Sequence, residues 1–225
     1  MADSDQIQTY RDYYLSDNAG APSIYHIWED GGGRGNVTTP AQSSPEYRAW
    51  MTGHLRTLLA ENPDSGLLSL GCGNGKIESG IATHGIRVLG VDALEDAVAL
   101  ARARGVDAVC ADVLNWMPPP GPWTVIYLDG ILGHLYDRDK GVGPALMRFR
   151  SWLPEGGVLV VSNDPPWDDS SEVQEHKDLP YFFLSQAYLQ GEVEACGFRE
   201  VTSTVFTYEK PVSGPRDRII VTARS

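Results

Sequence analysis

The chain has 225 residues, of which 42% are hydrophobic and 21% are charged, and its formal net charge is −12. This length and composition predict one globular α/β domain that buries its own core without disulfides or bound metals. The excess of acidic residues argues against nucleic acid and anionic membranes as partners, because both are bound through clustered lysine and arginine side chains.

The cysteines and the N-terminus indicate a cytoplasmic protein. Cys72, Cys110 and Cys196 are odd in number and far apart, so we expect free thiols in a reducing compartment. No CxxC or HxxxH spacing indicates a metal site. The first residues lack the basic and apolar regions of a signal peptide, and no apolar stretch approaches the ~20 residues that span a bilayer.

Residues 1–64 are rich in Tyr, Ser, Pro and Gly, and we expect them to form a helical cap over the body of the protein. The sequence predicts helices at Asp5–Leu15 and at Pro45–Leu59, the second with Ser44 as its N-cap and proline at its first position. The glycine-rich stretch DGGGRG, residues 30–35, would be a flexible hinge for this cap.

Residues 65–225 show the regular alternation of an α/β domain. Continuous apolar runs, typical of strands buried on both faces of a parallel sheet, lie at Leu67–Leu70, Arg87–Val91, Ala108–Ala111, Trp123–Leu128 and Val158–Ser162. Helical segments are predicted at Lys76–Thr83, Leu94–Arg104, Lys140–Leu153 and Ser185–Cys196.

The last two runs, 200–209 and 216–225, are β-branched and alternate in polarity, which is typical of an antiparallel hairpin. Five βα units followed by this hairpin predict a doubly wound, mostly parallel sheet of seven strands with helices on both faces. The sequence shows no internal repeat and no second domain.

The stretch LLSLGCGNGKIESG, residues 67–80, joins the first strand to a helix through Gly71, Gly73 and Gly75. Glycines at this edge of a parallel sheet let a ligand approach the main chain. The pattern suits either a dinucleotide or S-adenosylmethionine. The third glycine of the dinucleotide fingerprint would fall on Lys76, which disfavours a bound pyrophosphate.

Two acids end the next strands. Asp92 closes the run RVLGVD, where a carboxylate can accept hydrogen bonds from both ribose hydroxyls of either cofactor. Asp112 closes the third run, where a carboxylate could accept a hydrogen bond from an adenine amino group. An N-cap role for Asp92 and a turn role for Asp112 are the structural alternatives.

Five segments in order carry a family likeness: LLSLGCGNGKIE, VLGVD, CADVLNW, WTVIYLDGILGHL and LPEGGVLVVS. With them the chain resembles the class I S-adenosylmethionine-dependent methyltransferases. The likeness covers about residues 65–165 and extends to the terminal hairpin by topology. It implies S-adenosylmethionine as the cofactor, with S-adenosylhomocysteine as the product.

The resemblance also implies roles for individual residues. The three loop glycines would lie alongside the methionine part of the cofactor, and Asp92 would bind the ribose hydroxyls. Asp112 and Val113 would flank the adenine. Leu128 and Asp129 would reach the amino-acid end. The complete set of expected cofactor residues is Gly71, Cys72, Gly73, Gly75, Asp92, Ala93, Asp112, Val113, Leu128 and Asp129.

Methyl transfer from a sulfonium needs alignment of the nucleophile and exclusion of water, and a base only where the acceptor keeps its proton. His134, in the loop after the fourth strand, is the candidate base or orienting group, and it resembles a histidine of small-molecule methyltransferases. Asp129 and Asp164 are candidates for binding an amine of the substrate. A purely structural histidine remains the alternative for His134.

The substrate wall is expected from Tyr14, Tyr25 and Trp28, since rigid aromatic rings stack on small molecules and hold cationic groups. Packing of these rings in a helical core is the alternative. The acidic insertion 168–183, which contains His176, would either cover the pocket or remain a solvated loop.

The sequence therefore predicts a methyltransferase that acts on N or O of a small molecule, such as a bacterial secondary metabolite, as a monomer or homodimer. Two alternatives remain open at this point. One is a NAD-dependent oxidoreductase, and the other is a non-catalytic S-adenosylmethionine-binding protein.

Overall fold

The fold is taken from a computed structural model of the chain. The residues that the structure describes are 4–15, 20, 23–29, 37–62, 64–168, 171–177 and 179–225. The expected hinge at 30–35 lies outside them. Among the described residues, no helix combines the length and apolar character that a membrane span requires.

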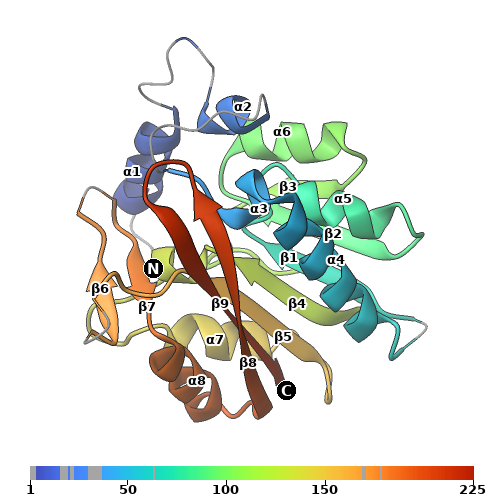
Figure 1. Ribbon diagram of the computed structural model, residues 1–225. Coiled ribbons are helices and arrows are strands. Elements are labelled where there is room, and N and C mark those ends of the chain that lie inside the picture. The colour runs from blue at the N-terminus through green and yellow to red at the C-terminus, as the bar shows by residue number, and fades with distance from the viewer. Residues whose placement is uncertain are drawn as a thin grey trace.

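A seven-stranded sheet with the order β3-β2-β1-β4-β5-β9-β8 forms the centre of the molecule (Figure 1). Its strands are β1 Gly66–Leu70, β2 Arg87–Asp92, β3 Asp107–Cys110, β4 Trp123–Asp129, β5 Val158–Asn163, β8 Arg199–Lys210 and β9 Gly214–Arg224. The first five pair in parallel, and β9 runs antiparallel between β5 and β8. The predicted doubly wound sheet with a terminal hairpin is confirmed.

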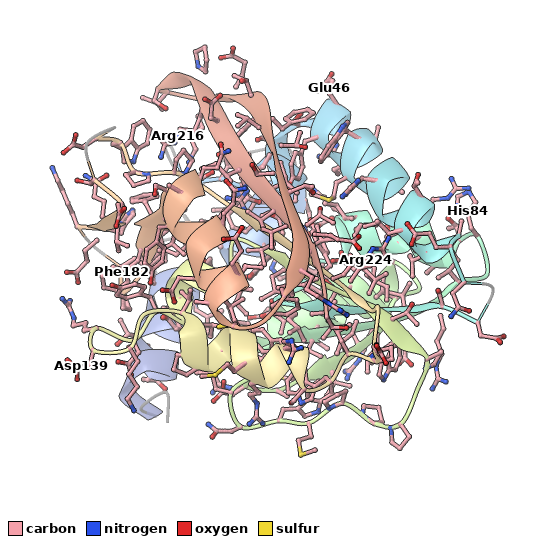
Figure 2. All side chains as sticks on the ribbon, turned by 90° about the horizontal axis from the view of Figure 1, so that it is seen from below. Glu46, His84, Asp139, Phe182, Arg216 and Arg224 are labelled. Carbon is pink, nitrogen blue, oxygen red and sulfur yellow. The ribbon has the colours of Figure 1, made fainter. Side chains whose placement is uncertain are left out.

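Helices cover both faces of this sheet. The helices of the body are α4 Pro45–Leu59, α5 Lys76–Ala82, α6 Glu95–Ala103, α7 Gly143–Arg150 and α8 Gln186–Ala195. Apolar side chains of α4, α5 and α6 form one core with the sheet, and those of α7 and α8 form the other. Figure 2 looks from below onto α7 and α8.

Alternation along each strand divides the two cores. In β1, Leu67 belongs to the core under α4 and α5, whereas Leu68 and Leu70 belong to the core under α7 and α8. All three are fully buried, because each face of the strand is covered by helices. Ser44 caps α4 as expected, with its hydroxyl accepting a hydrogen bond from the Tyr47 amide at 3.0 Å.

Two expectations for the body need correction. The βα unit after β3 has no helix, because residues 111–122, all of them described, form turns and bends with four prolines near their end. The helix expected at Lys140–Leu153 is shorter, and it begins only at Gly143 because an isolated bridge between Asp137 and Gly141 precedes it. Its shorter length leaves the core contacts of Leu146 and Phe149 in place.

The N-terminal helices α1 Ser4–Leu15, α2 Ile24–Glu29 and α3 Pro40–Ser43 lie over the edge of the sheet where the parallel strands end (Figure 1). Of these, only α1 was predicted, because α2 and α3 are too short to show a helical period.

The acidic insertion forms a second, two-stranded sheet of β6 Val173–Glu175 and β7 Phe182–Leu184. Leu179, Tyr181 and Phe183 of this insertion form a buried cluster, against which Tyr10 and Tyr13 of α1 pack. The described part of the insertion therefore packs against α1, whereas the sequence left a solvated loop as an alternative.

Candidate active site

A cavity of about 1130 Å³, counted out to its open mouth, lies at the carboxyl ends of β1, β2 and β4. Side chains of α1, α2 and α3 line its other side. Of the residues singled out in the sequence, those that line it are Tyr14, Tyr25, Trp28, Gly71, Cys72, Gly73, Asp92, Ala93, Asp112, Val113, Asp129 and His134. Gly75, Leu128 and Asp164 are not among its lining residues.

The glycine loop turns sharply beneath this cavity. Gly71, Gly73 and Gly75 have φ angles of +73°, +54° and +71°, in the left-handed region that favours glycine. A Cβ on Gly71 would lie 2.9 Å from Ile131, and one on Gly73 would lie 3.2 Å from the Tyr25 ring. Both glycines therefore keep the space between loop and cavity wall free of side chains.

Gly75 serves the packing of the body instead. A Cβ there would lie 3.0 Å from the Cβ of Ala101 in α6. The glycine thus lets α5 start close against α6. Leu128 is likewise fully buried in the core under α7 and α8, so that only its backbone adjoins Asp129 at the cavity.

Asp92 holds the glycine loop in place. Its carboxylate accepts hydrogen bonds from the Gly73 amide at 2.9 Å and from the Leu94 amide at 3.0 Å. The residue is 7% exposed, and burial raises the pKa of its carboxyl group. A carboxylate has about four acceptor positions, so Asp92 can bind these two amides and still accept hydrogen bonds from the cavity.

Asp112 makes the turn that the sequence analysis gave as its structural alternative, and it also lines the cavity. Its carboxylate accepts hydrogen bonds from the Leu114 amide at 3.0 Å and from the Asn115 side chain at 2.5 Å, which makes a local turn. The same residue lines the cavity beside Val113. This side of the cavity therefore offers a carboxylate next to a buried apolar side chain.

A second buried carboxylate, which the sequence analysis did not single out, belongs to Glu78 of α5. It lines the cavity, is 3% exposed, and accepts a hydrogen bond from the Ser69 hydroxyl at 2.6 Å. Burial, with smaller contributions from Asp129 and Asp92, raises the pKa of Glu78 to about 7. The sequence did hold one signal of this burial. Glu78 precedes the apolar Ile81 by three residues, which places both side chains on the same face of a helix.

The cap supplies aromatic rings to the opposite wall. Tyr14 stacks on Tyr25 with their centroids 5.7 Å apart, and Trp28 meets Tyr25 edge-on at 5.1 Å. The Trp28 indole donates a hydrogen bond to the Val37 carbonyl at 3.0 Å. These three rings are thus brought together by packing, and they face the cavity as well as one another.

His134 lies at the junction of cap, insertion and body. Its ring is 4.5 Å from that of Tyr10 and 4.8 Å from that of Tyr181, measured between centroids. Burial lowers the pKa of His134 to about 4, so the ring is neutral near pH 7. In a neutral ring Nδ1 donates to the Pro180 carbonyl at 3.4 Å, which leaves Nε2 as an acceptor toward the Tyr14 hydroxyl at 3.5 Å.

Polar contacts fasten the cap to the glycine loop. Glu29 at the end of α2 pairs with Arg104 and accepts a hydrogen bond from Asn74. The Lys76 ammonium donates to the Trp28 carbonyl at 3.0 Å. Through these contacts α2 is held against the loop that follows β1.

The two remaining acids lie in one network. Asp129 lines the cavity and pairs with the buried Arg218, which also pairs with Asp164 at 2.9 Å. Asp164 is 6% exposed and has its partners within the protein. In the part of the chain that is described, no group of three His, Cys, Asp or Glu side chains could hold a metal ion.

Known proteins agree with this architecture. Residues 44–203 match a family described as a methyltransferase domain. The chain is 36% identical over 204 residues to a tabtoxin biosynthesis enzyme of Pseudomonas amygdali pv. tabaci, across 89% of this chain and 80% of that protein.

Two solved structures are similar in fold. The 1,6-didemethyltoxoflavin-N1-methyltransferase of Burkholderia thailandensis has a TM-score of 0.67 and 21% identity, over 100% of this chain and 91% of the other. The magnesium protoporphyrin IX methyltransferase of Synechocystis PCC 6803 has a TM-score of 0.67 and 17% identity, over the whole of both chains.

The family match decides between the two ligands that the glycine loop suited, since a dinucleotide oxidoreductase would not match a methyltransferase domain across most of its length. The sheet order, the glycine loop and the acid that ends β2 agree with it. The chain therefore belongs to the class I S-adenosylmethionine-dependent methyltransferases.

Proposed function

We propose that this protein transfers a methyl group from S-adenosylmethionine to a nitrogen or oxygen atom of a small molecule, in the biosynthesis of a secondary metabolite. The observation that carries the proposal is the cavity in which a glycine loop and acidic side chains face a wall of aromatic rings. The similarity to a tabtoxin biosynthesis enzyme supports a biosynthetic role. The free cysteines support a reducing, cytoplasmic setting.

We assign the cofactor's parts to the cavity by chemistry. Asp92 would accept hydrogen bonds from the ribose hydroxyls, and Asp112 with Val113 would border the adenine. Glu78 and Asp129, both buried carboxylates on the cavity wall, would receive the ammonium of the amino-acid end. Cofactor bound in this way would direct its methyl group toward the wall that carries His134.

The aromatic wall would bind the acceptor. Tyr14, Tyr25 and Trp28 offer flat apolar faces, and the cap keeps water away from the transferring methyl group. On binding, the acceptor's N–H or O–H group would replace the Tyr14 hydroxyl as the donor to Nε2 of His134, and this hydrogen bond would align the acceptor's lone pair with the methyl carbon.

A product assay tests the proposal. The protein would be incubated with S-adenosylmethionine carrying an isotopically labelled methyl group and with a panel of small amines and alcohols, and the products would be examined by mass spectrometry. We expect transfer of the label to at least one acceptor. Tight binding of S-adenosylhomocysteine together with no transfer to any acceptor, or to water, would favour the non-catalytic alternative.

Replacement of His134 by alanine is expected to lower kcat by about 10- to 100-fold, because one orienting or proton-accepting contact with the acceptor is lost. Binding of S-adenosylhomocysteine should change little. Because the ring is already neutral, the wild-type rate should show no histidine titration between about pH 5.5 and 7.5. Steady-state kinetics over this pH range, beside calorimetric titration, would measure both effects.

The matched control is His176→Ala, on the insertion that borders His134. It should leave kcat unchanged. Equal loss of cofactor affinity and turnover in the His134→Ala protein would instead make His134 a structural residue.

A further inference from the structure

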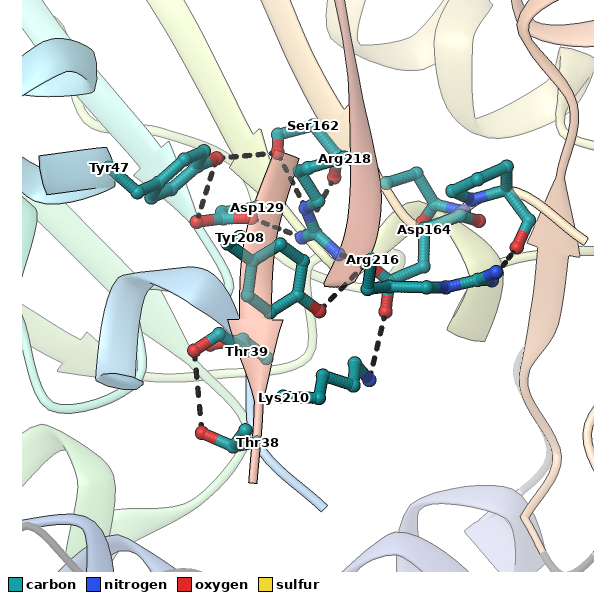
Figure 3. A network of polar contacts seen from close by, with 12 residues as sticks. Thr38, Thr39, Tyr47, Asp129, Ser162, Asp164, Tyr208, Lys210, Arg216 and Arg218 are labelled. Carbon is teal, nitrogen blue, oxygen red and sulfur yellow. Dashed lines mark hydrogen bonds and ion pairs between the residues drawn. The ribbon is translucent and has the colours of Figure 1, made fainter. Parts of the chain in front are cut away.

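The terminal hairpin places a buried guanidinium between the ends of two parallel strands (Figure 3). Arg218 lies on β9 and is 1% exposed. It pairs with Asp129 at the end of β4 and with Asp164 just beyond β5, and its Nε donates to the Ser162 hydroxyl at 2.8 Å. All three nitrogens of the guanidinium therefore have partners.

Asp129 is held from both sides by this arrangement. One carboxylate oxygen meets Arg218, and the other accepts hydrogen bonds from Tyr127 at 2.9 Å and from Tyr47 at 3.4 Å. The Tyr47 hydroxyl in turn is 2.6 Å from that of Ser162, which also contacts Arg218. The orientation of the Asp129 carboxylate at the cavity is thus set by the protein.

Cations outnumber carboxylates in this network. Arg218 pairs with Asp129 and Asp164, Lys210 lies 3.5 Å from Asp164, and Arg216 adds a weaker attraction to Asp164. Burial alone would raise the pKa of Asp164, but Arg218 and Lys210 lower it below its ordinary value. Buried ion pairs of this kind are often no more stabilising than apolar side chains of the same volume, so stability alone does not account for the network.

The guanidinium also supports the loop that follows β4. Gly130 has a φ angle of +76°, and a Cβ on it would lie 3.0 Å from Nη2 of Arg218. The backbone turn at Gly130 therefore packs against the guanidinium, just before the chain reaches Ile131 and His134. Any change at Arg218 acts on Asp129 and on this turn together.

We propose that Arg218 is a positioning residue for the amino-acid end of the cofactor site, which it serves by compensating and orienting the Asp129 carboxylate that receives the ammonium. This inference rests on the proposed function. Without Arg218, the Asp129 carboxylate would lie near Glu78 with no cation to pair with, and it would turn away from its present position. Its contact with the ammonium would then be lost.

Two ligands separate this role from a general structural one. S-adenosylhomocysteine has the amino-acid end, whereas 5′-methylthioadenosine has the same adenosine and thioether without it. In calorimetric titrations, Arg218→Met should lower the affinity for S-adenosylhomocysteine by about 10-fold. It should change the affinity for 5′-methylthioadenosine by less than about two-fold. Arg218→Lys, which keeps the charge but not the fork that spans both carboxylates, should show a smaller loss of the same kind.

A double variant tests whether Arg218 acts through Asp129. Asp129→Asn combined with Arg218→Met should bind S-adenosylhomocysteine no more weakly than Asp129→Asn alone. Lys210→Met is the matched control, because it removes a cation that pairs with Asp164 and not with Asp129, and it should leave both affinities unchanged.

Additive effects in the double variant would overturn the proposal, as would equal losses for both ligands or an equal loss in Lys210→Met. If Arg218→Met fails to fold, Arg218→Lys carries the same comparison. A wild-type protein that bound neither ligand would contradict the proposed function instead.

Discussion

Replacement of Asp92 by alanine is expected to weaken S-adenosylhomocysteine binding by about 1000-fold, or ~4 kcal/mol. Two charge-assisted hydrogen bonds to the ribose would be lost. The Gly73 and Leu94 amides, which donate to the carboxylate at 2.9 and 3.0 Å, would also lose their acceptor, so the glycine loop would no longer be held. Both effects act on the same ligand, which is why we expect this loss to be the largest.

Calorimetric titration of Asp92→Ala, Asp92→Asn and Asp112→Ala would check this expectation. Asp92→Asn keeps the shape of the side chain and one of its two oxygens, so its loss of affinity should be intermediate. Asp112 is partly exposed and makes a local turn, so Asp112→Ala should lower the affinity for S-adenosylhomocysteine by about 10-fold at most. Similar losses of affinity in Asp92→Ala and Asp112→Ala would contradict the assignment of Asp92 to the ribose.

The Glu78→Gln protein is expected to be more stable than wild type at about pH 8, by up to ~3 kcal/mol. Burial raises the pKa of Glu78 to about 7 in the folded state, so the fold favours the protonated carboxyl group. The stability that this group contributes is complete below its ordinary pKa and is lost as the pH rises through 7. Glutamine resembles the protonated form, so the difference should vanish below about pH 4.5.

Cofactor affinity should respond in the opposite sense. A bound ammonium favours ionised Glu78, so wild-type affinity for S-adenosylhomocysteine should increase as the pH rises through about 7, with release of a proton. Glu78→Gln should bind about 100-fold more weakly above pH 7 and lose this pH dependence.

Thermal unfolding and calorimetric titration across this pH range would measure both responses to the Glu78 substitution. A variant with wild-type affinity at every pH would show that Glu78 has no contact with the ligand. Ser69→Ala offers a milder comparison, because it removes only the hydroxyl that donates to Glu78 at 2.6 Å.

Much of the fold could be predicted because strands and helices leave local periods in the chain. The apolar runs of β1 and β2, the helix α4 with its Ser44 cap, and the terminal hairpin all agree with the structure. The absence of a helix after β3 and the presence of the short helices α2 and α3 were not predicted, since a few residues without a clear period do not distinguish a helix from a turn.

The candidate site divides in the same way. Gly71, Gly73 and Asp92 follow directly from a strand–loop–helix pattern, whose geometry is local. Asp164 shows the limit, because its place at a strand end indicated an acid that could bind an amine of the substrate, whereas Arg218 and Lys210 from the hairpin are its partners. Glu78 was missed because its burial depends on neighbouring elements as well as on its own helix.

The sequence by itself determined the sheet, the glycine loop and the acid that ends β2, since each depends on residues that are neighbours in the chain. Only the tertiary structure decided that Arg218 meets Asp129 across 89 positions, and that Tyr14 reaches His134 across 120. Such pairs form when packing brings distant segments together. Periodicity in the sequence does not predict such contacts, because they depend on the three-dimensional course of the intervening chain.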